Sequence, residues 1–589
     1  MSRFFNRKSI AFVLVALALV AGFIGSFALR GQSHAAGSAV HAISSTQTKG
    51  TSALAGSMSW SQLKTTTATG QPTPQHKFDV NRMGVNNKVS SSASNAPAVT
   101  ATAMGTATGA VAASQSKKTS NVGKLLQSFD GVSDLDNANT QSIILTPPDQ
   151  GLCVGNAPFL GAQKVVFEPV NVTFKVFDTH GNDLTGAVPD FVIYNESPNE
   201  FISDPRCQYD TATKTFFFTI LAIDPSGTTS HFDVAVIHPS GTISNYQFDT
   251  TDSTGRGCPC FGDQPLLGID KYNLYVSNNE FPIAASQIYN GAEVYAISKS
   301  QLAAGAPLVN FAEISNISDQ GILIETLQPA ITYDAKAPAE YLLHSFTVDV
   351  NGANNSFDHR LGVFAITNQA AVTAGGFPTL SNPTVINSEP YAQPNLALQP
   401  DPSLVLNPDD DRMQQVEYIN GNLMGALSSA VSVQGDTITR DGAAWFDIEP
   451  SLKGSLTVNA KIKHQGYIAA SGSYILYPAI MQSKDGNVVM AFSITSSTMN
   501  PSAAYAVVPD ETHTSNAGAI NVAATGNGTY FDSFSCSGVL PPGCRWGDYS
   551  WATLDPNSNN IWMGSEYIPP VARQFPNANW GTRVYEVGA

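Results

Sequence analysis

The sequence predicts an all-β protein folded as a β-propeller, in which four-stranded antiparallel sheets are arranged as blades around one axis. Only 13% of the residues are charged, and the 47 Gly and 35 Pro suit a fold with many turns. Helical periodicity is nearly absent after the N-terminal segment, apart from one or two turns at 298–304. A unit made of a polar corner, an apolar strand, a turn and an aromatic-rich strand recurs along the chain, which is typical of repeat folds.

The clearest copy of this unit is 545–567 (RWGDYSWATLDPNSNNIWMGSEY). A Gly-Asp corner leads into an alternating strand at 549–554, the chain turns at Asp555-Pro556, and an apolar strand returns through 561–563. Further copies begin at Asp204 (DPRCQYDTATKTFFFTILAI), Gly262 (GDQPLLGIDKYNLYVSNNEF) and Gln328 (QPAITYDAKAPAEYLLHSF).

One stretch contains the strands of a complete blade. A short strand before Asp210 is followed by strands at 215–223, 231–237 and 242–248, the last two joined by a turn at 239–241. Four consecutive antiparallel strands with tight turns form one propeller blade. The run at 215–223 is almost wholly apolar, as expected of a strand covered on both faces.

The polar corners predict the number of blades. Candidate blade starts are Asp149, Asp204, Asp263, Gln328, Asp411, Tyr477 and Asp548. They predict seven blades, or six if one weak copy is a loop, and two separate sandwiches are the alternative to a propeller. The final run 583–587 (RVYEV) is expected to join an incomplete blade and close the ring, which removes exposed sheet edges.

The N-terminal region predicts export. Basic residues in the first eight positions precede an apolar run at 10–29 and a stretch of small residues, which is the pattern of an export signal in 1–42. A retained membrane anchor is the alternative, since about 20 apolar residues also span a bilayer. Residues 43–123 are rich in Ser, Thr, Ala and Gly and are expected to be a disordered linker, because they offer little apolar surface to bury. The propeller then occupies 124–589, outside the cytoplasm.

Six cysteines lie within the predicted propeller, and an even number in an exported chain predicts disulfides. The expected pairs are Cys536–Cys544, which closes a short Gly/Pro-rich loop, Cys153–Cys207 and, as a tight bridge, Cys258–Cys260. The alternative for Cys258 and Cys260 is that each pairs with another cysteine. A zinc site is disfavoured, because no histidine or second close cysteine pair lies at ligand spacing.

Several of these motifs resemble a family of exported bacterial β-propeller proteins that is largely uncharacterised. They are PPDQGLCVGN from Pro147, DPRCQYD from Asp204, GDQPLLGID from Gly262, NLMGALSSAV from Asn422, and RWGDYSWATLDP with IWMGSEYI from Arg545. The resemblance covers about residues 124–589 and implies a fold and an extracytoplasmic location, but no activity. The turn at 483–487 (SKDGN) is distantly similar to the turn repeat of sialidases, although it lacks the terminal Thr-Trp.

Charge and motifs exclude or disfavour several functions. The net charge of −16 disfavours nucleic-acid binding, which needs a basic surface. The chain has no G-x-S-x-G, H-E-x-x-H or G-x-x-x-x-G-K-[ST] motif, and His359-Arg360 is expected to have a structural role. A Ser-His-Asp set remains open, because such residues meet only in space. Carboxylates or a Tyr for glycoside cleavage would come from Glu280, Glu566 and Tyr549.

The polar corners are the candidate site, because equivalent positions of the inner strands converge on a propeller axis. The predicted ligand-binding residues are Asp204, Arg206, Asp263, Asp411, Arg412, Arg545, Asp548 and Glu566. Carboxylates gathered in this way suit calcium or a polar sugar. The alternative is structural, with each Asp bonding local backbone amides or its own Arg. No cofactor other than calcium is expected.

Two further groups of residues have both a functional and a structural interpretation. Acidic residues at 409–411 and at Asp130, Asp134 and Asp136 resemble incomplete calcium loops, which are more often simply solvated. Trp546, Tyr549, Trp551 and Trp562 either stack on sugar faces or pack in the core, with Tyr549 and Trp551 on the same side of their strand.

The sequence therefore predicts a monomeric surface protein that binds a glycan or a cell-surface protein without catalysis. Only its N-terminal segment is expected to meet the membrane. A secreted glycoside hydrolase of sialidase-like type, or an ester hydrolase, is the alternative, and a purely architectural part of the cell envelope is a third hypothesis.

Overall fold

The computed structural model describes residues 45–63, 99–101, 121–141, 144–255, 257–283, 289–346, 357–509, 518–533, 535–536, 543–570 and 578–589. The chain divides into two compact units, 1–40 and 41–589, and every described residue belongs to the second. The predicted export signal or anchor at 1–42 lies outside the described residues. No helix among them is long and apolar enough to cross a membrane.

Strands that follow one another in the sequence pair antiparallel in successive runs. Strands β1 (Thr46–Ser59) and β18 (Ile331–Thr332) join three of these runs into one 16-stranded sheet, and each run is called a sheet below. The first sheet is β4 (Cys153–Ala157), β5 (Ala162–Val170), β6 (Thr173–Asp178) and β7 (Val188–Pro189). The second run is β8 (Phe201–Asp210), β9 (Thr215–Ile223), β10 (Ser230–Ile237) and β11 (Thr242–Asp249), and the third is β12 (Cys260–Ile269), β13 (Asn273–Pro282), β14 (Gly291–Ser298) and β15 (Leu308–Asp319).

Three more runs follow the same plan. They are β17 (Gln328–Pro329), β19 (Glu340–Ser345), β20 (Phe357–Thr367), β21 (Thr379–Leu380) and β22 (Thr384–Ala392); then β24 (Val416–Ile419), β25 (Asn422–Val433), β26 (Arg440–Leu452) and β27 (Val458–Ile468); then β28 (Tyr474–Gln482), β29 (Val488–Ser496), β30 (Met499–Val507) and β31 (Ile520–Ala524). The last sheet has β33 (Trp551–Leu554), β34 (Ile561–Tyr567), β35 (Gly581–Val587) and, at its outer edge, β3 (Leu125–Ser133).

Shorter elements lie between or beside these sheets. They are the strands β2 (Val99–Ala101), β16 (Ile322–Leu323), β18 (Ile331–Thr332), β23 (Leu406–Asn407) and β32 (Cys544–Arg545), the helices α3 (Asp134–Gln141), α4 (Asp190–Tyr194) and α5 (Lys299–Ala303), and the 3-10 turns η2 (Pro158–Leu160) and η3 (Gln369–Ala374). Strand β18 pairs parallel with both β12 and β24, so it joins two runs near their first strands. The brief helix predicted at 298–304 corresponds to α5.

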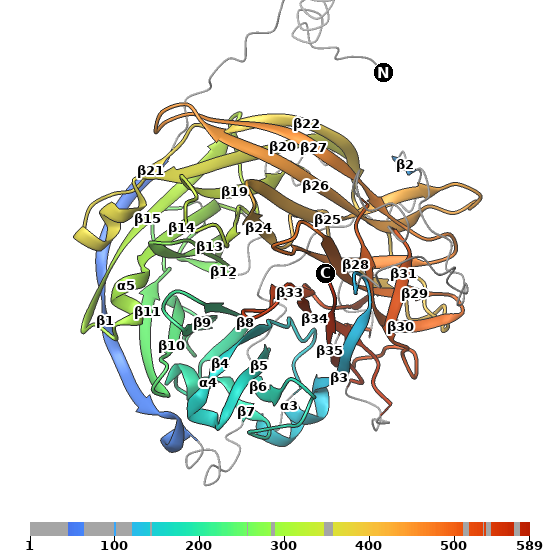
Figure 1. The fold of residues 1–589 in the computed structure, drawn as a ribbon, viewed down its shortest axis with the longest axis horizontal. Coiled ribbons are helices and arrows are strands. Elements are labelled where there is room, and N and C mark those ends of the chain that lie inside the picture. The colour runs from blue at the N-terminus through green and yellow to red at the C-terminus, as the bar shows by residue number, and fades with distance from the viewer. Residues whose placement is uncertain are drawn as a thin grey trace, which may run out of the picture. The chain divides into compact units, whose positions relative to one another are not determined.

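Within this unit the sheets stand around a common centre, as in a β-propeller. First strands such as β8, β12, β24 and β33 face the centre of the ribbon, and last strands such as β11, β15 and β22 lie at the periphery (Figure 1). The predicted strands at 215–223, 231–237 and 242–248 are confirmed as β9, β10 and β11. The prediction of an all-β fold with propeller-like sheets is therefore confirmed.

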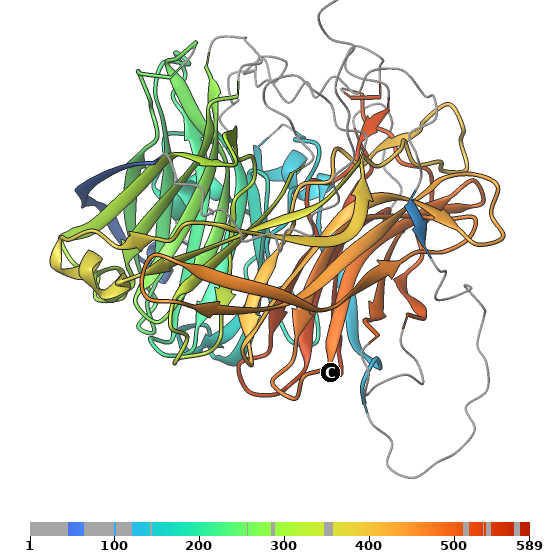
Figure 2. The same ribbon diagram turned by 90° about the horizontal axis from the view of Figure 1, so that it is seen from above.

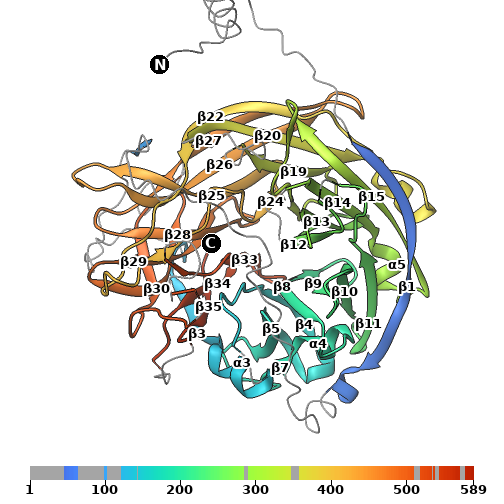
Figure 3. The same cartoon turned by 180° about the vertical axis from the view of Figure 1, so that it is seen from behind.

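The last sheet joins segments from far apart in the sequence. Strand β35, which contains the predicted run 583–587, pairs with β34 on one side and with β3 on the other. Figures 1 and 3 show β3 beside β35 from opposite sides. Because β3 precedes the first sheet in the sequence, this pairing fastens the end of the propeller region to its beginning.

Neighbouring sheets bury apolar faces against each other. All nine residues of β9 are buried, which explains its continuous apolar sequence. The Phe167 ring of β5 lies 4.8 Å from Phe216 and 5.3 Å from Phe218 of β9, between centroids. Each fully buried Phe stabilises the fold by about 1.5–3 kcal/mol, so facing sheets hold one another in place.

The structure corrects part of the predicted linker. Residues 46–59 form strand β1 (Thr46–Ser59), which pairs antiparallel with the outer strand β15 and then with the outer strand β11. Figure 2 shows β1, in blue, on the outer edge of the sheets. The small side chains that suggested disorder do not prevent this pairing, because the hydrogen bonds come from the backbone and two open edges are available.

A large side chain follows β1 and anchors it. Trp60 is buried in the core between the first two sheets, where its ring lies 5.8 Å from Phe167 and 5.5 Å from Phe159. Leu63 is buried in the same core. The segment 46–63 is therefore part of the folded unit, whereas a linker role for the rest of 43–123 stays a prediction.

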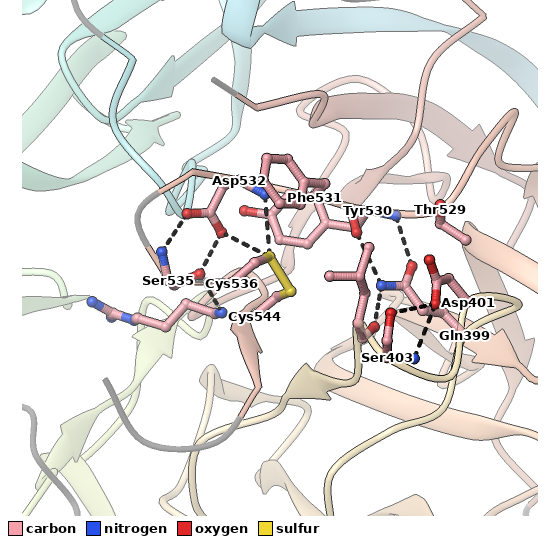
Figure 4. Close-up of a disulfide and its surroundings, with 12 residues drawn as sticks. Gln399, Asp401, Ser403, Thr529, Tyr530, Phe531, Asp532, Ser535, Cys536 and Cys544 are labelled. Atoms are coloured by element: carbon pink, nitrogen blue, oxygen red, sulfur yellow. Dashed lines mark hydrogen bonds between the residues drawn. A yellow bond between two sulfur atoms is a disulfide. The ribbon is translucent and has the colours of Figure 1, made fainter. Parts of the chain in front are cut away.

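The three predicted disulfides are confirmed as Cys153–Cys207, Cys258–Cys260 and Cys536–Cys544. Cys153 of β4 and Cys207 of β8 belong to the first strands of neighbouring sheets, so this bridge ties the two sheets together near the centre. Figure 4 shows Cys536–Cys544 with Asp532, whose backbone N–H lies 3.2 Å from the Cys536 Sγ. Disulfides of this number are typical of proteins outside the cytoplasm.

Candidate functional site

Three of the predicted polar corners are β-bulges in first strands. The register of β8 against β9 shifts between Ser203 and Arg206, that of β12 against β13 shifts between Asp263 and Leu266, and that of β28 against β29 shifts between Leu476 and Ala479. A bulge redirects a side chain and bends its strand, and bulges are frequent next to functional sites.

Each of these bulges contains a residue in the left-handed region followed by a proline. The residues are Asp204 (φ 58°), Gln264 (φ 53°) and Tyr477 (φ 52°), each before a Pro. Three other corners also have a left-handed residue, namely Asp149 (φ 47°), Thr326 (φ 56°) and Asp409 (φ 61°). Such backbone conformations are rare outside glycine and cluster at functional sites, so their repetition marks the corners as one shared structural feature.

The corners bring acidic and basic side chains from different sheets together. We call this set the axial cluster: Asp149, Asp204, Arg206, Asp263, Glu325, Asp409, Asp410, Arg412, Tyr477, Arg545, Asp548 and Tyr549. Asp204 interacts electrostatically with Arg206, Asp548 and Arg545, and Asp263 interacts with Asp204 and Arg412. Because these residues come from the starts of successive sheets, the convergence expected of a propeller is present.

Ion pairs neutralise much of the charge in the axial cluster. Arg412 Nη2 lies 2.7 Å from Asp409 Oδ2 and 2.6 Å from Asp410 Oδ2. Arg545 Nη2 lies 2.5 Å from Asp548 Oδ2, and the Asp548 N–H donates to Asp149 Oδ1 at 3.1 Å. Since these carboxylates already have guanidinium partners, a calcium ion would have to displace them.

Burial has a strong effect on the acids of this cluster. Desolvation, together with the charges of Asp548 and Asp204, raises the pKa of Asp149 well above its ordinary value. Desolvation and the charge of Asp204 also raise the pKa of Asp263, and desolvation raises that of Glu325. The cluster therefore contains carboxyl groups that hold protons at higher pH than free carboxyl groups do.

Arg206 lies against two aromatic rings. Its guanidinium carbon is 3.4 Å from the centroid of Tyr549 and 5.3 Å from that of Trp551, a cation–π arrangement. The prediction that Tyr549 and Trp551 share a side is therefore confirmed. The other two predicted aromatic residues pack in the core, Trp546 against Tyr530 and Trp562 against Phe129.

A small cavity adjoins this aromatic contact. It has a volume of about 10 Å³, room for about one water molecule, and is lined by Arg206, Gln328, Arg412, Gln415, Tyr549 and Trp551, among others. Three groups of these residues form no hydrogen bond with any described residue: Arg206 Nη2, the Tyr549 hydroxyl and Trp551 Nε1. A buried donor without an acceptor is unfavourable, so this cavity favours a small acceptor group.

The structure places two predicted site residues away from the centre of the cluster. The carboxylates that pair with Arg412 come from Asp409 and Asp410, whereas the Asp411 carbonyl accepts from Ser345 Oγ at 3.0 Å and its charge acts on Tyr391. Glu566 accepts from the Gly547 N–H at 2.7 Å and lies behind the corner that contains Asp548.

Other candidates lie in separate places. Glu280 lies with Asp252 and the Cys258–Cys260 disulfide, where burial raises its pKa to about 8. Asp130 pairs with Arg583, and Asp136 pairs with Lys175 at 2.7 Å, so these acids are not gathered as calcium ligands. Next to His359, Arg360 pairs with Asp358 at 2.7 Å, which gives this segment the structural contact that was expected.

Sequence reasoning missed Asp149, Glu325, Asp409, Asp410 and Tyr477 as members of the cluster. A signal was present for part of this set, because Asp204, Gln264 and Tyr477 all precede a proline at the corner. Asp409 and Asp410 belong to the acidic run that resembles a calcium loop, whereas Glu325 has no comparable signal in the sequence, because its position depends on how its loop enters the centre.

Comparisons with known proteins show only distant similarity. No family model and no curated protein matches the sequence. Among solved structures, the chain is similar to the phage phi92 endosialidase (8% identity, TM-score 0.34, covering 64% of this chain and 65% of that one). It is also similar to Drosophila Plexin A in complex with Semaphorin 1b (7%, TM-score 0.32, 80% and 88%) and to an N-acetylgalactosamine deacetylase from F. plautii (9%, TM-score 0.29, 79% and 95%). These similarities are too weak to indicate a function.

Proposed function

We propose that this protein is an exported or surface-tethered β-propeller of seven blades that binds a polar glycan at the axial cluster without catalysis. Each run of strands from β4 to β35 is one blade, and β3 completes the last. The pattern of residues 1–42, a basic start followed by an apolar run, supports export or tethering.

The observation that carries the proposal is the convergence of acceptor and donor groups from separate sheets on one place. A sugar hydroxyl both donates and accepts hydrogen bonds, so it is matched by carboxylates next to guanidinium groups. The cluster reaches solvent at Arg545 and Asp409, whose side chains are 26% and 15% exposed, whereas Arg206 is buried. Tyr549 and Trp551 add aromatic surface beside the Arg206 donors.

A structural role is the competing explanation, because ion pairs hold the corners together whether or not a ligand binds. Arg206 separates the two explanations. It lines the cavity, has a donor without an acceptor, and makes no ion pair with any described residue within 4.0 Å. We therefore expect Arg206 to matter more for binding than for folding.

The test is a glycan array probed with the purified chain and with Arg206→Met, which keeps the apolar stem but removes the donors. Binding of the variant to the array hits should be at least tenfold weaker, while an unchanged circular dichroism spectrum shows that the fold is retained. Arg583→Met, at an outer pair with Asp130, is the matched control and should bind normally. Binding of Arg206→Met at wild-type strength, or the absence of any hit, would contradict the proposal.

A hydrolase is the second candidate. It is favoured because a carboxyl group with a raised pKa lies next to a carboxylate that pairs with an arginine. Asp149 is an acid of this kind beside Asp548, which pairs with Arg545, and enzymes that cleave glycosides use one protonated and one ionised carboxyl group. Chromogenic glycosides and esters should show no turnover if the protein only binds. Turnover that is lost in Asp548→Asn or Glu566→Gln, with an unchanged circular dichroism spectrum, would replace binding by hydrolysis.

A further inference from the structure

A second group of acids lies away from the axis, on the outer half of the sheet β8–β11. We call it the outer cluster: Glu196, Glu200, His231 and Asp233. His231 and Asp233 are two residues apart on β10, so their side chains point to the same face. Glu196 follows α4, which packs against β10, and Glu200 immediately precedes β8. Figure 3 shows α4 near β10.

The side chains of this cluster lie within the span of a single ion. Three possible ligand atoms, one each from Glu196, His231 and Asp233, lie within 4.8 Å of one another. His231 Nδ1 is 3.1 Å from Asp233 Oδ1, and two ligands of one tetrahedral zinc ion lie roughly 3.4 Å apart. Glu196 also interacts with Glu200, which adds a further carboxylate beside these three groups.

Neighbouring residues orient the carboxylates. The Gln247 amide of β11 donates to Glu196 Oε1 at 2.6 Å, and the Gln247 carbonyl accepts from Ser52 Oγ of β1 at 2.8 Å. Outer hydrogen bonds of this kind fix the direction of ligands in metal sites. The segment β1 thus lies next to the outer cluster.

The charge of this cluster is not balanced by the protein. Among the described residues, no Lys or Arg forms an ion pair with Glu196, Glu200 or Asp233, and the basic group that faces them is His231. Asp233 is 0% exposed, and its second carboxylate oxygen forms no hydrogen bond with a described residue. Asp233 also shares a side-chain hydrogen bond with Glu196, so the buried negative charge of this group of side chains is met either by a proton or by a bound cation.

We propose that Glu196, Glu200, His231 and Asp233 bind a divalent transition-metal ion of the zinc class. One imidazole nitrogen with carboxylate oxygens suits zinc, whereas calcium takes oxygen ligands only. The ion ties the 195–200 loop to β10 and, through Gln247, to β11 beside β1. Its role is to hold this outer region together, and it takes no part in ligand binding at the axial cluster.

The test is calorimetric titration of the full chain, stripped of metal with a chelator, with zinc chloride and separately with calcium chloride. Zinc should bind and raise the melting temperature, because an ion that binds only the folded state stabilises it. Glu196→Gln and His231→Gln should each weaken zinc binding at this site at least about 100-fold, and Gln247→Ala about 10-fold to 100-fold, the range for outer-shell partners. Glu196 is half-exposed, so its variant is expected to fold.

His464→Gln is the matched control, because His464 of β27 pairs with Asp447 of β26 at 2.8 Å, in another run of strands. It should leave zinc binding unchanged. Zinc binding that is equally strong in Glu196→Gln and His231→Gln, no rise in melting temperature, or binding of calcium but not zinc would each overturn the proposal.

Discussion

The axial cluster and the outer cluster both gather carboxyl groups, but they differ in how the charge is balanced. In the axial cluster Arg412 and Arg545 pair with Asp409, Asp410 and Asp548. In the outer cluster the carboxylates face only His231 among the described basic residues. Arginines of the protein therefore pair with part of the axial carboxylates, whereas the carboxylates of the outer cluster have no such partner and depend on protons or on a bound cation.

The largest expected loss of stability comes from removing an arginine of the axial cluster. Arg412→Leu leaves Asp409 and Asp410 without their guanidinium partner, and breaking a buried pair in this way costs about 3–5 kcal/mol of stability. Urea unfolding measures it. Arg583→Leu, which breaks a partly exposed pair with Asp130, should cost less than about 1 kcal/mol. Equal losses in the two variants would show that the axial pairs are not balanced as described.

A second experiment loosens one corner of the axial cluster without changing its charges. The Cys536–Cys544 disulfide precedes Arg545, and the Arg545 N–H donates to Ser535 Oγ at 2.8 Å. Replacing both cysteines by serine should cost about 2.5 kcal/mol, because a short loop is no longer closed in the unfolded chain. The outer cluster lies in another sheet, so zinc binding should be unchanged in this variant, and a change would show that the two clusters are coupled.

In a third experiment, replacing one Asp by Asn changes the stability of the fold in opposite directions in the two clusters. Without metal at pH 8, Asp233→Asn should stabilise the fold by about 1–2 kcal/mol. Burial raises the pKa of the Asp233 carboxyl group, so folding at this pH must either protonate it or bury its charge, and the amide avoids both costs. Asp410→Asn should instead destabilise the fold, because it weakens the pair with Arg412. Thermal unfolding of both variants measures the two signs, and the same sign in both would remove the distinction.

The smallest effect is the pH dependence of the outer cluster. Burial, with the hydrogen bond and charge of Glu196, raises the pKa of Glu200 from 4.5 to about 7. Between these values the folded state binds more protons than the unfolded state, so this contribution is present below pH 4.5 and is lost as the pH rises to 7. It is modest because Glu200 is partly exposed. The fall in melting temperature from pH 5 to pH 7.5 should be smaller in Glu200→Gln without metal. An unchanged fall would contradict this assignment.

Much of the fold could be predicted from local patterns. Strand β9 was predicted with its exact bounds from a continuous apolar run, and the three cysteine pairs were predicted from export and spacing. The polar corners were recognised at Asp204, Asp263 and Asp548 because their residues recur in the sequence. Alternation, turn residues and loop spacing act over a few residues, so a sequence contains them directly.

The remaining features depend on which segments the closed arrangement brings together. Strand β1 has no strong apolar pattern, and it folds because the edges of β11 and β15 are open to it. Asp411 was predicted as a site residue, but the ion pairs with Arg412 come from Asp409 and Asp410. The path of the loop decides which of these three adjacent carboxylates faces Arg412. Glu196 and His231 meet across 35 positions only because α4 packs against β10. The sequence by itself determined the strands, the corners and the disulfides, whereas long-range packing decided which charged groups share a site.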